Sequence, residues 1–150
     1  MKVSKKARYA LQALVDLTTN MKENPIPLAE IAGRQEMSFS YLEQVFHELK
    51  KAGVVKSMKG PRGGYMLAKP ADQTTAEEIF NAVEEKFCIV EVKKEEKLDA
   101  LQLAIRKLVW DQIDEDVIAL LKNMTLADIA ENVWENSEEV KSESDVDAAK

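Results

Sequence analysis

The chain has 150 residues, of which 45% are hydrophobic, with a net charge of −6 and one cysteine. This length suits one ordinary folded domain with an appended arm. No apolar run approaches membrane-spanning length, and the basic start of the chain lacks the apolar stretch of a signal peptide, so we expect a cytoplasmic protein. The single Cys88 excludes an internal disulfide framework and a metal site built from several cysteines of one chain.

The net charge is distributed unevenly along the chain. Residues 1–69 hold 12 Lys/Arg and 6 Asp/Glu, whereas residues 70–150 hold 9 and 21. An excess of positive charge draws a protein to phosphates, and an excess of negative charge repels it from them. The first half therefore suits a nucleic-acid partner, although an accidental asymmetry of a solvated surface would give the same counts.

The first predicted helix covers residues 4–19, with Ser4 as a suitable N-cap. Its start is basic, which suits either the DNA backbone or plain solvent. Tyr9 lies off the apolar face. The predicted inward stripe consists of Ala7, Leu11, Leu14, Val15 and Thr18. Two prolines in residues 24–27 then end this helix, and the segment that contains them is predicted to be extended.

Two further helices have the spacing of a helix-turn-helix. Residues 28–35 form the shorter one, residues 36–37 the turn, and residues 38–51 the longer one, which Gly53 ends. The apolar positions of the longer helix recur at helical spacing. The predicted inward residues of the pair are Leu28, Ile31, Ala32, Leu42, Val45, Phe46 and Leu49.

Two short strands are predicted directly after the longer helix. Residues 54–58 and 65–67 read as strands, and the loop 59–64 contains three glycines and one proline, as a hairpin tip requires. The tip carries two cations and no acid. A helix followed by a basic hairpin is typical of a winged helix-turn-helix. The predicted fold class is therefore mainly α, with a small β-hairpin wing.

The polar side of the longer helix and the wing carry the candidate DNA contacts. Serine, glutamine and glutamate offer the donors and acceptors that base edges require, and the cations of the wing suit phosphates. Each of these residues alone is equally compatible with ordinary solvated surface. The predicted DNA-contacting residues are Ser38, Ser40, Tyr41, Glu43, Gln44, Lys56, Lys59 and Arg62.

An enzyme is not expected. His47, the only histidine, has no nucleophile or acid pattern that would make it a catalyst. The glycine-rich residues 60–64 lack the Lys-Ser/Thr ending of a phosphate-binding loop.

A helix capped by Thr74 or Thr75 is predicted next, with Ile79, Phe80 and Val83 inward. Residues 96–122 then read as one long helix with a 3-4 apolar repeat, which indicates a contact between two helices. Dimerisation explains this repeat better than a core-facing helix of a monomer. The predicted dimerisation residues are Leu98, Leu101, Ile105 and Leu108, with Gln112 continuing the repeat.

The chain is expected to end in a short helix over residues 125–134, capped by Thr125, and a polar tail over residues 135–150, predicted to be disordered. The inward residues of the short helix are Leu126, Ile129, Ala130 and Val133. The predicted domains are thus a DNA-binding domain over residues 1–85, a dimerisation region over 86–134 and the tail.

Cys88 has apolar neighbours, including Phe87 and Ile89, which favours a buried and unreactive thiol. A redox switch is the alternative. That role would need an exposed thiol and a neighbouring cation such as Lys86.

Several segments together resemble the Rrf2 family of bacterial winged-helix regulators, of the IscR, NsrR and CymR type. They are KKARYAL from residue 5, SFSYLEQ from residue 38, LKKAGVV from residue 49, KGPRGGY from residue 59 and AEEIFNAVE from residue 76. The resemblance is strong over residues 1–85 and weaker over 111–134. It implies a homodimeric transcription regulator on a palindromic DNA operator, with the recognition helix reading bases and Arg62 at the wing tip.

The chain departs from part of this family. Members that hold an iron–sulfur cluster carry three cysteines after this point, whereas here Cys88 stands alone. The resemblance therefore implies no cofactor and favours the branch of the cysteine-metabolism repressor, whose signal comes through a partner enzyme, a small metabolite or a thiol. The alternative function is a winged-helix adaptor that binds protein through its acidic half.

Overall fold

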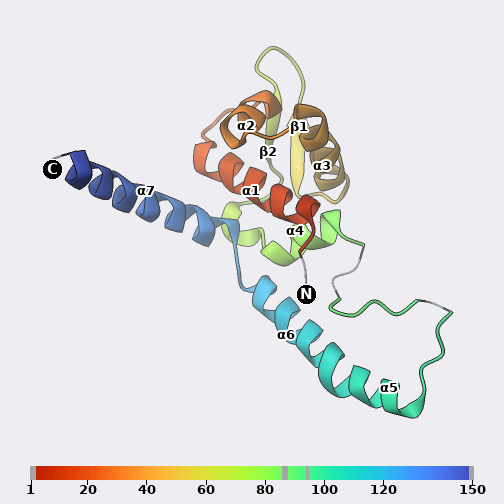
Figure 1. Cartoon of the computed structure of the whole chain (residues 1–150). Coiled ribbons are helices and arrows are strands. Elements are labelled where there is room, and N and C mark those ends of the chain that lie inside the picture. Colours follow the sequence, from red (N-terminus) through yellow and green to blue (C-terminus); the bar gives the residue numbers. More distant parts are fainter. Residues whose placement is uncertain (1–2, 86–87, 94, 149–150) are drawn as a thin grey trace.

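The computed structural model of the protein describes residues 3–85, 88–93 and 95–148. As predicted, the described chain is mainly helical with one two-stranded antiparallel hairpin. Figure 1 shows a packed unit, residues 3–83, which we call the head, and two helical segments that extend away from it. No helix in the described ranges is long and apolar enough to cross a membrane.

The head contains four α-helices, the hairpin and a short 3₁₀ turn. Its elements in chain order are α1 Lys5–Asn20, α2 Leu28–Gln35, α3 Phe39–Lys51, β1 Val55–Met58, β2 Gly64–Leu67, the 3₁₀ turn Ala71–Gln73 and α4 Ala76–Val83. Ser4 caps α1, Ser38 caps α3 and Thr75 caps α4, each by accepting a backbone N–H of the first turn.

The buried face of α1 differs from the predicted stripe. Its fully buried apolar residues are Ala7, Ala10, Ala13, Leu14 and Leu17. Leu11, Val15 and Thr18 are only half-buried. Apolar residues occupy almost every position from 10 to 17, so the pattern alone did not fix the inward side. The alanines allow neighbouring elements to pack close to α1.

A buried carboxylate joins α1 to α2. Asp16 is 5% exposed and accepts hydrogen bonds from Nε and a terminal nitrogen of Arg34, at 3.0 and 2.7 Å, and from Gln35 at 2.7 Å. The hydrogen bond with Asp16 raises the pKa of Arg34, so this guanidinium stays charged. The network satisfies the buried charge and fixes the angle between the two helices.

The inward residues predicted for α2 and α3 are all buried. Glu36 joins the two helices in a left-handed conformation with φ of 52°, and Gly53, with φ of 79°, follows the end of α3 as predicted. The predicted extended piece also forms, because Ile26 pairs with Tyr65 of β2 through backbone hydrogen bonds of 2.8 and 2.9 Å. The wing is therefore anchored to the head at its base.

The long helix starts later than predicted. It begins with α5 Ala100–Ile105, passes through a π-helical turn Arg106–Trp110 and continues as α6 Asp111–Lys122. Asp99 and Gln102 form a capping box that fixes the start, so Leu98 precedes the helix instead of lying on it. Trp110 is half-buried and lines a pocket with Val90 and Val92 of the connecting segment.

The last helix, α7 Leu126–Ala148, is much longer than predicted. Leu126 is fully buried, and backbone hydrogen bonds of 2.8 and 2.9 Å join residues 74–76 to residues 124–126. Residues 135–148 are helical rather than irregular, although every one of them is exposed. No glycine or proline follows Pro70 in the sequence, so nothing in this segment breaks the helix.

Candidate nucleic-acid interface

One side of α3 is free of contacts with the head. Its buried residues face inward, so positions spaced by three and four residues on the opposite side point outward. The outward residues are Ser40, Gln44, His47 and Lys51, all exposed. Ser38 and Glu43 are also exposed, at the start of the helix and on one flank. The outward side thus presents hydroxyl, amide and imidazole groups, which can bind base edges.

Tyr41 lies on the other flank of α3, beside α1. Its ring is half-buried and packs edge-on against the ring of Tyr9, with 5.8 Å between centroids and an interplanar angle of 84°. Lys5 Nζ lies 5.1 Å from the Tyr9 centroid and 5.5 Å from the Tyr41 centroid. Tyr41 is therefore positioned by α1, whereas Ser40 and Gln44 are free in front of the helix.

The wing is a tight hairpin that projects beyond the rest of the head (Figure 1). Strand β1 pairs with β2 from Val55↔Leu67 to Met58↔Gly64. A Cβ on Gly63 would lie 2.3 Å from the carbonyl oxygen of Met58, and one on Gly64 would lie 2.4 Å from that of Ile26. Only glycine fits at these two positions, because the neighbouring backbone leaves no space for a Cβ. Gly63 thus permits the tight tip, and Gly64 permits the close contact between the wing and the head.

Three exposed cations lie along the wing. Lys56 is on β1, and Lys59 and Arg62 are in the loop at the tip. None of the three makes an ion pair with any residue that the structure describes. Their charges are therefore available to an anionic partner such as the phosphate backbone.

Sequence reasoning missed two features of this surface. Phe39, at the first position of α3, is 49% exposed and adds an apolar side chain to this surface. Its place beside the cap residue Ser38 could have identified it. The grouping of Lys5 and Tyr9 with Tyr41 was also missed, because contacts between distant helices leave no local sequence signal.

The predicted dimerisation residues on the long helix are exposed in the single chain. Leu101, Ile105 and Leu108 are 67%, 40% and 79% exposed, and α5 and α6 contain no buried residue. Leu98 is half-buried beside the helix start. Figure 1 shows this helix extending away from the head.

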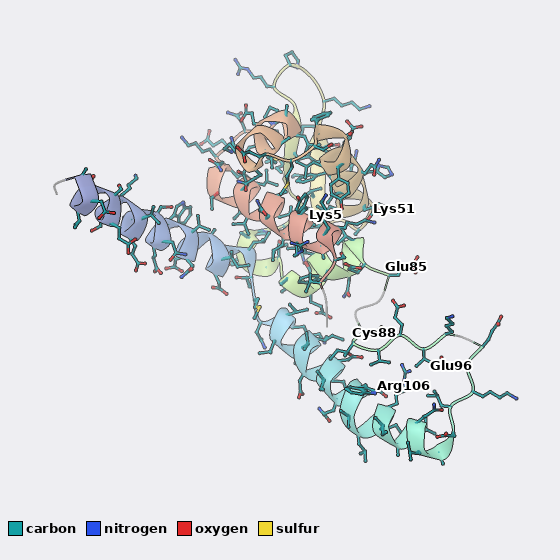
Figure 2. All side chains as sticks on the ribbon, viewed as in Figure 1. Lys5, Lys51, Glu85, Cys88, Glu96 and Arg106 are labelled. Carbon is teal, nitrogen blue, oxygen red and sulfur yellow. The ribbon has the colours of Figure 1, made fainter. Side chains whose placement is uncertain are left out.

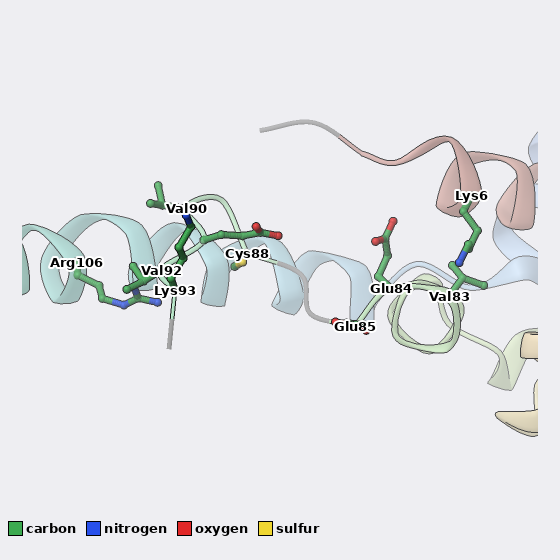
Figure 3. A pocket seen from close by; sticks show the side chains of 10 residues that line it. Lys6, Val83, Glu84, Glu85, Cys88, Val90, Val92, Lys93 and Arg106 are labelled. Carbon is green, nitrogen blue, oxygen red and sulfur yellow. The ribbon is translucent and has the colours of Figure 1, made fainter. Parts of the chain in front are cut away.

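Cys88 lies in the segment that connects α4 to α5, at the edge of a pocket of about 520 Å³. Its side chain is half-buried, so the predicted full burial is wrong. The segment runs outside the head and has no core to enter. Figure 3 shows Val90, Val92 and Arg106 near Cys88, with Lys6, Val83 and Glu84 at the other end of the pocket. Phe87 and Lys86, invoked as its neighbours, lie outside the described residues.

Comparison with known proteins identifies relatives along most of the chain. Residues 3–132 match the Rrf2 family, described as "Iron-dependent Transcriptional regulator". The HTH-type transcriptional regulator IscR of Erwinia tasmaniensis is 36% identical over 132 residues, which cover 88% of this chain and 80% of the relative.

Two solved structures share the fold. CymR, the global cysteine regulator of B. subtilis, superimposes with a TM-score of 0.73 at 36% identity, covering 88% of this chain and 98% of that one. IscR of T. potens superimposes with a TM-score of 0.71 at 34% identity, covering 89% and 88%.

The residues present do not fit the iron site that the family description suggests. An iron–sulfur cluster is held mainly by cysteine thiolates, and the sequence contains only Cys88. Within the described ranges, no group of three His, Cys, Asp or Glu side chains could hold a metal ion. This departure concerns the connecting segment and does not involve α3 or the wing. By its match over residues 3–132 and its identity to IscR, the chain belongs to the Rrf2 family of transcriptional regulators and has their DNA-binding winged-helix fold.

Proposed function

We propose that this protein is a homodimeric, sequence-specific DNA-binding repressor that works without an iron–sulfur cluster. One observation carries the proposal: an uncovered row of polar residues on α3 lies in the same head as a projecting wing with unpaired cations. A helix of about 10–12 Å diameter fills a major groove of about 12 Å width, and the wing then reaches the flanking phosphates or minor groove.

The residues take distinct roles in this proposal. Ser38, which caps α3, and Ser40, Glu43 and Gln44 on the exposed part of the helix read base edges, Glu43 by accepting from cytosine. Tyr41, held on the flank, contacts the sugar–phosphate backbone. Lys56 and Lys59 bind phosphates, and Arg62 at the tip suits a narrow A·T-rich minor groove. The readers lie at the N-terminal end of α3, the end that enters the groove.

The exposed apolar surface of the long helix supports the dimer. The long helix exposes seven large apolar residues along its length, which is rare on a surface that stays in water. They are Leu101, Leu103, Ile105, Leu108, Val109, Ile113 and Leu120. Packing against the same helix of a partner covers them and places two recognition helices on one DNA molecule, so the operator should be an inverted repeat.

Regulation of sulfur or cysteine metabolism is the proposed biological role. Its support is the single cysteine, which cannot supply a cluster ligand set, and the similarity to the B. subtilis CymR structure. The chain is 36% identical to IscR and 36% identical to CymR, so sequence identity does not separate the IscR branch from the CymR branch. The choice between them rests on the missing cysteine ligands alone. The effector then arrives as a small molecule, a thiol or a partner protein.

Selection of bound duplexes from a random DNA library tests the function directly. We expect the full-length, iron-free protein to enrich one inverted repeat whose half-sites lie about one helical turn, or a small multiple of it, apart. If no sequence is enriched, the proposal is wrong and the protein-binding adaptor becomes the better explanation. The family assignment alone does not support that adaptor.

A further inference from the structure

We infer that Lys5 of α1 binds a DNA phosphate at the edge of the groove that α3 occupies, and that the rings of Tyr9 and Tyr41 hold it there. This inference rests on the proposed function. Lys5 comes from outside the recognition helix and the wing, so it adds a third element to the DNA-binding surface. Figure 2 shows Lys5 and Lys51 on α1 and α3 of the head.

The first step of the argument is the geometry of a helix in a groove. A helix that fills the major groove points one side at the base edges and its two flanks at the two phosphate walls. The base-facing side of α3 is the one with Ser40 and Gln44. Tyr41 and Glu48 lie on the flank toward α1, because Tyr41 contacts Tyr9 and Glu48 contacts Lys6. The start of α1 therefore faces one phosphate wall.

The second step is charge. Glu48 on this flank would repel a phosphate, but Lys6 pairs with it at 3.2 Å and compensates its charge. Lys5 is exposed and makes no ion pair with a described residue. The first turn of α1 contains no acid. Lys5 is thus a cation on the flank of α3 that no acid of the described residues pairs with.

The third step is positioning. An ammonium within about 6 Å of an aromatic centroid is attracted to the ring face. Lys5 Nζ meets this condition for two rings at once, at 5.1 and 5.5 Å. The two rings also pack against each other, and both contact the hydrophobic core. A lysine held in this way loses less conformational freedom when it binds a phosphate than a lysine that moves freely in water.

Salt-dependent binding of the selected operator, with the full-length dimer, tests the inference. Lys5→Met keeps the length of the side chain and removes its charge. We expect it to weaken binding to all single-base operator variants by the same factor and to reduce the salt slope by about 1. The loss of affinity between 50 and 200 mM salt should accordingly be about fourfold smaller than in the wild type. Lys5→Arg should retain the wild-type slope.

Lys141→Met is the matched control. It makes the same charge change at an exposed position of α7, far along the chain from the head, and should leave affinity and slope unchanged. Thermal unfolding of each variant checks that the head is intact. A wild-type slope in Lys5→Met, or an effect confined to one base position, would overturn the inference while the proposed function stands. Failure of the wild type to bind any duplex would instead overturn both.

Discussion

The head and the long α5–α6 helix differ in where their apolar side chains lie. Among the residues that the structure describes, nearly all buried ones belong to the head, and the two that do not, Leu126 and Ala130, are on α7. The α5–α6 helix has none and exposes leucines instead. The head, together with Leu126 of α7, therefore forms a hydrophobic core, whereas the long helix obtains no comparable burial within one chain.

The two regions also differ in their charge and therefore in their attraction to DNA. Residues 1–69, which form most of the head, carry the excess positive charge, and the wing cations make no ion pair with any described residue. The region that follows the head is strongly acidic. Like charges direct the acidic half away from DNA while the basic head approaches it. The proposed function therefore assigns DNA binding and dimerisation to separate surfaces of one chain, and we expect that each can be disrupted without the other.

The largest effect should come from placing charges on the long helix. Leu101→Glu with Leu108→Glu would bury four carboxylates in each dimer, so we expect monomers. Sedimentation velocity measures this, and circular dichroism checks that the head stays folded. Lys107→Glu changes the net charge by the same amount at an exposed polar position and should remain dimeric. A dimer in the double variant would show that the copies associate elsewhere.

The next effect concerns the attachment of α7 to the head. Leu126 is 0% exposed, and Leu126→Ala should lower the free energy of unfolding by about 3 kcal/mol through lost burial and a residual cavity. Val140→Ala, at a side chain that is 64% exposed, should change it by less than about 0.5 kcal/mol. Urea denaturation measures both. Equal, small effects would mean that α7 is not part of the folded core.

A smaller effect separates base reading from phosphate binding within the head. Gln44→Ala should cost about 1–3 kcal/mol at one base position and leave the other positions unchanged. Lys56→Ala is its contrast, because loss of a phosphate contact weakens all sequences alike and reduces the salt slope by about 1. Competition binding across single-base operator variants distinguishes the two. A uniform loss in Gln44→Ala would remove this residue from the base readers.

The smallest effect on operator affinity should come from treatment with an iron chelator. Because one cysteine per chain cannot complete a cluster ligand set, purified protein should be colourless, and chelator treatment should leave operator affinity unchanged. Cys88→Ser should bind the operator as the wild type does, since Cys88 lies in the connecting segment and not on α3 or the wing. Visible absorbance, iron content and binding titrations test this. A brown preparation with bound iron would contradict it.

The sequence predicted the head best where local signals end each element. Pro27, Ser38 and Gly53 mark the limits of α2 and α3, and their helical bounds agree with the prediction to within one residue. The basic hairpin followed from its glycines, two of which have no space for a Cβ. The exposed positions on α3 followed from helical spacing, because a single apolar stripe identified the buried side.

The remaining errors have separate physical causes. The long helix starts later than its apolar repeat predicts, because the capping box of Asp99 and Gln102 fixes the first turn at Ala100. The contacts of Asp16 with Arg34 and of Lys5 with Tyr41 join elements distant in sequence, and local patterns do not report such pairs. The tail was predicted from polarity, which describes poor burial but does not exclude a solvated helix.

The hydrogen bonds between residues 74–76 and 124–126 attach one end of the long helix to the head, so a rotation at this end is amplified at the other end. They fasten its base to the head beside α4, and its free end lies roughly 35 Å away at about 1.5 Å per residue. A rotation of about 5° at this base moves the tip by about 3 Å. If the long helices of two chains pack together in a dimer, the same rotation changes the distance between the two α3 helices. In the proposed dimer, we therefore expect a small rotation at this base to change how well the spacing of the two heads matches the helical repeat of DNA.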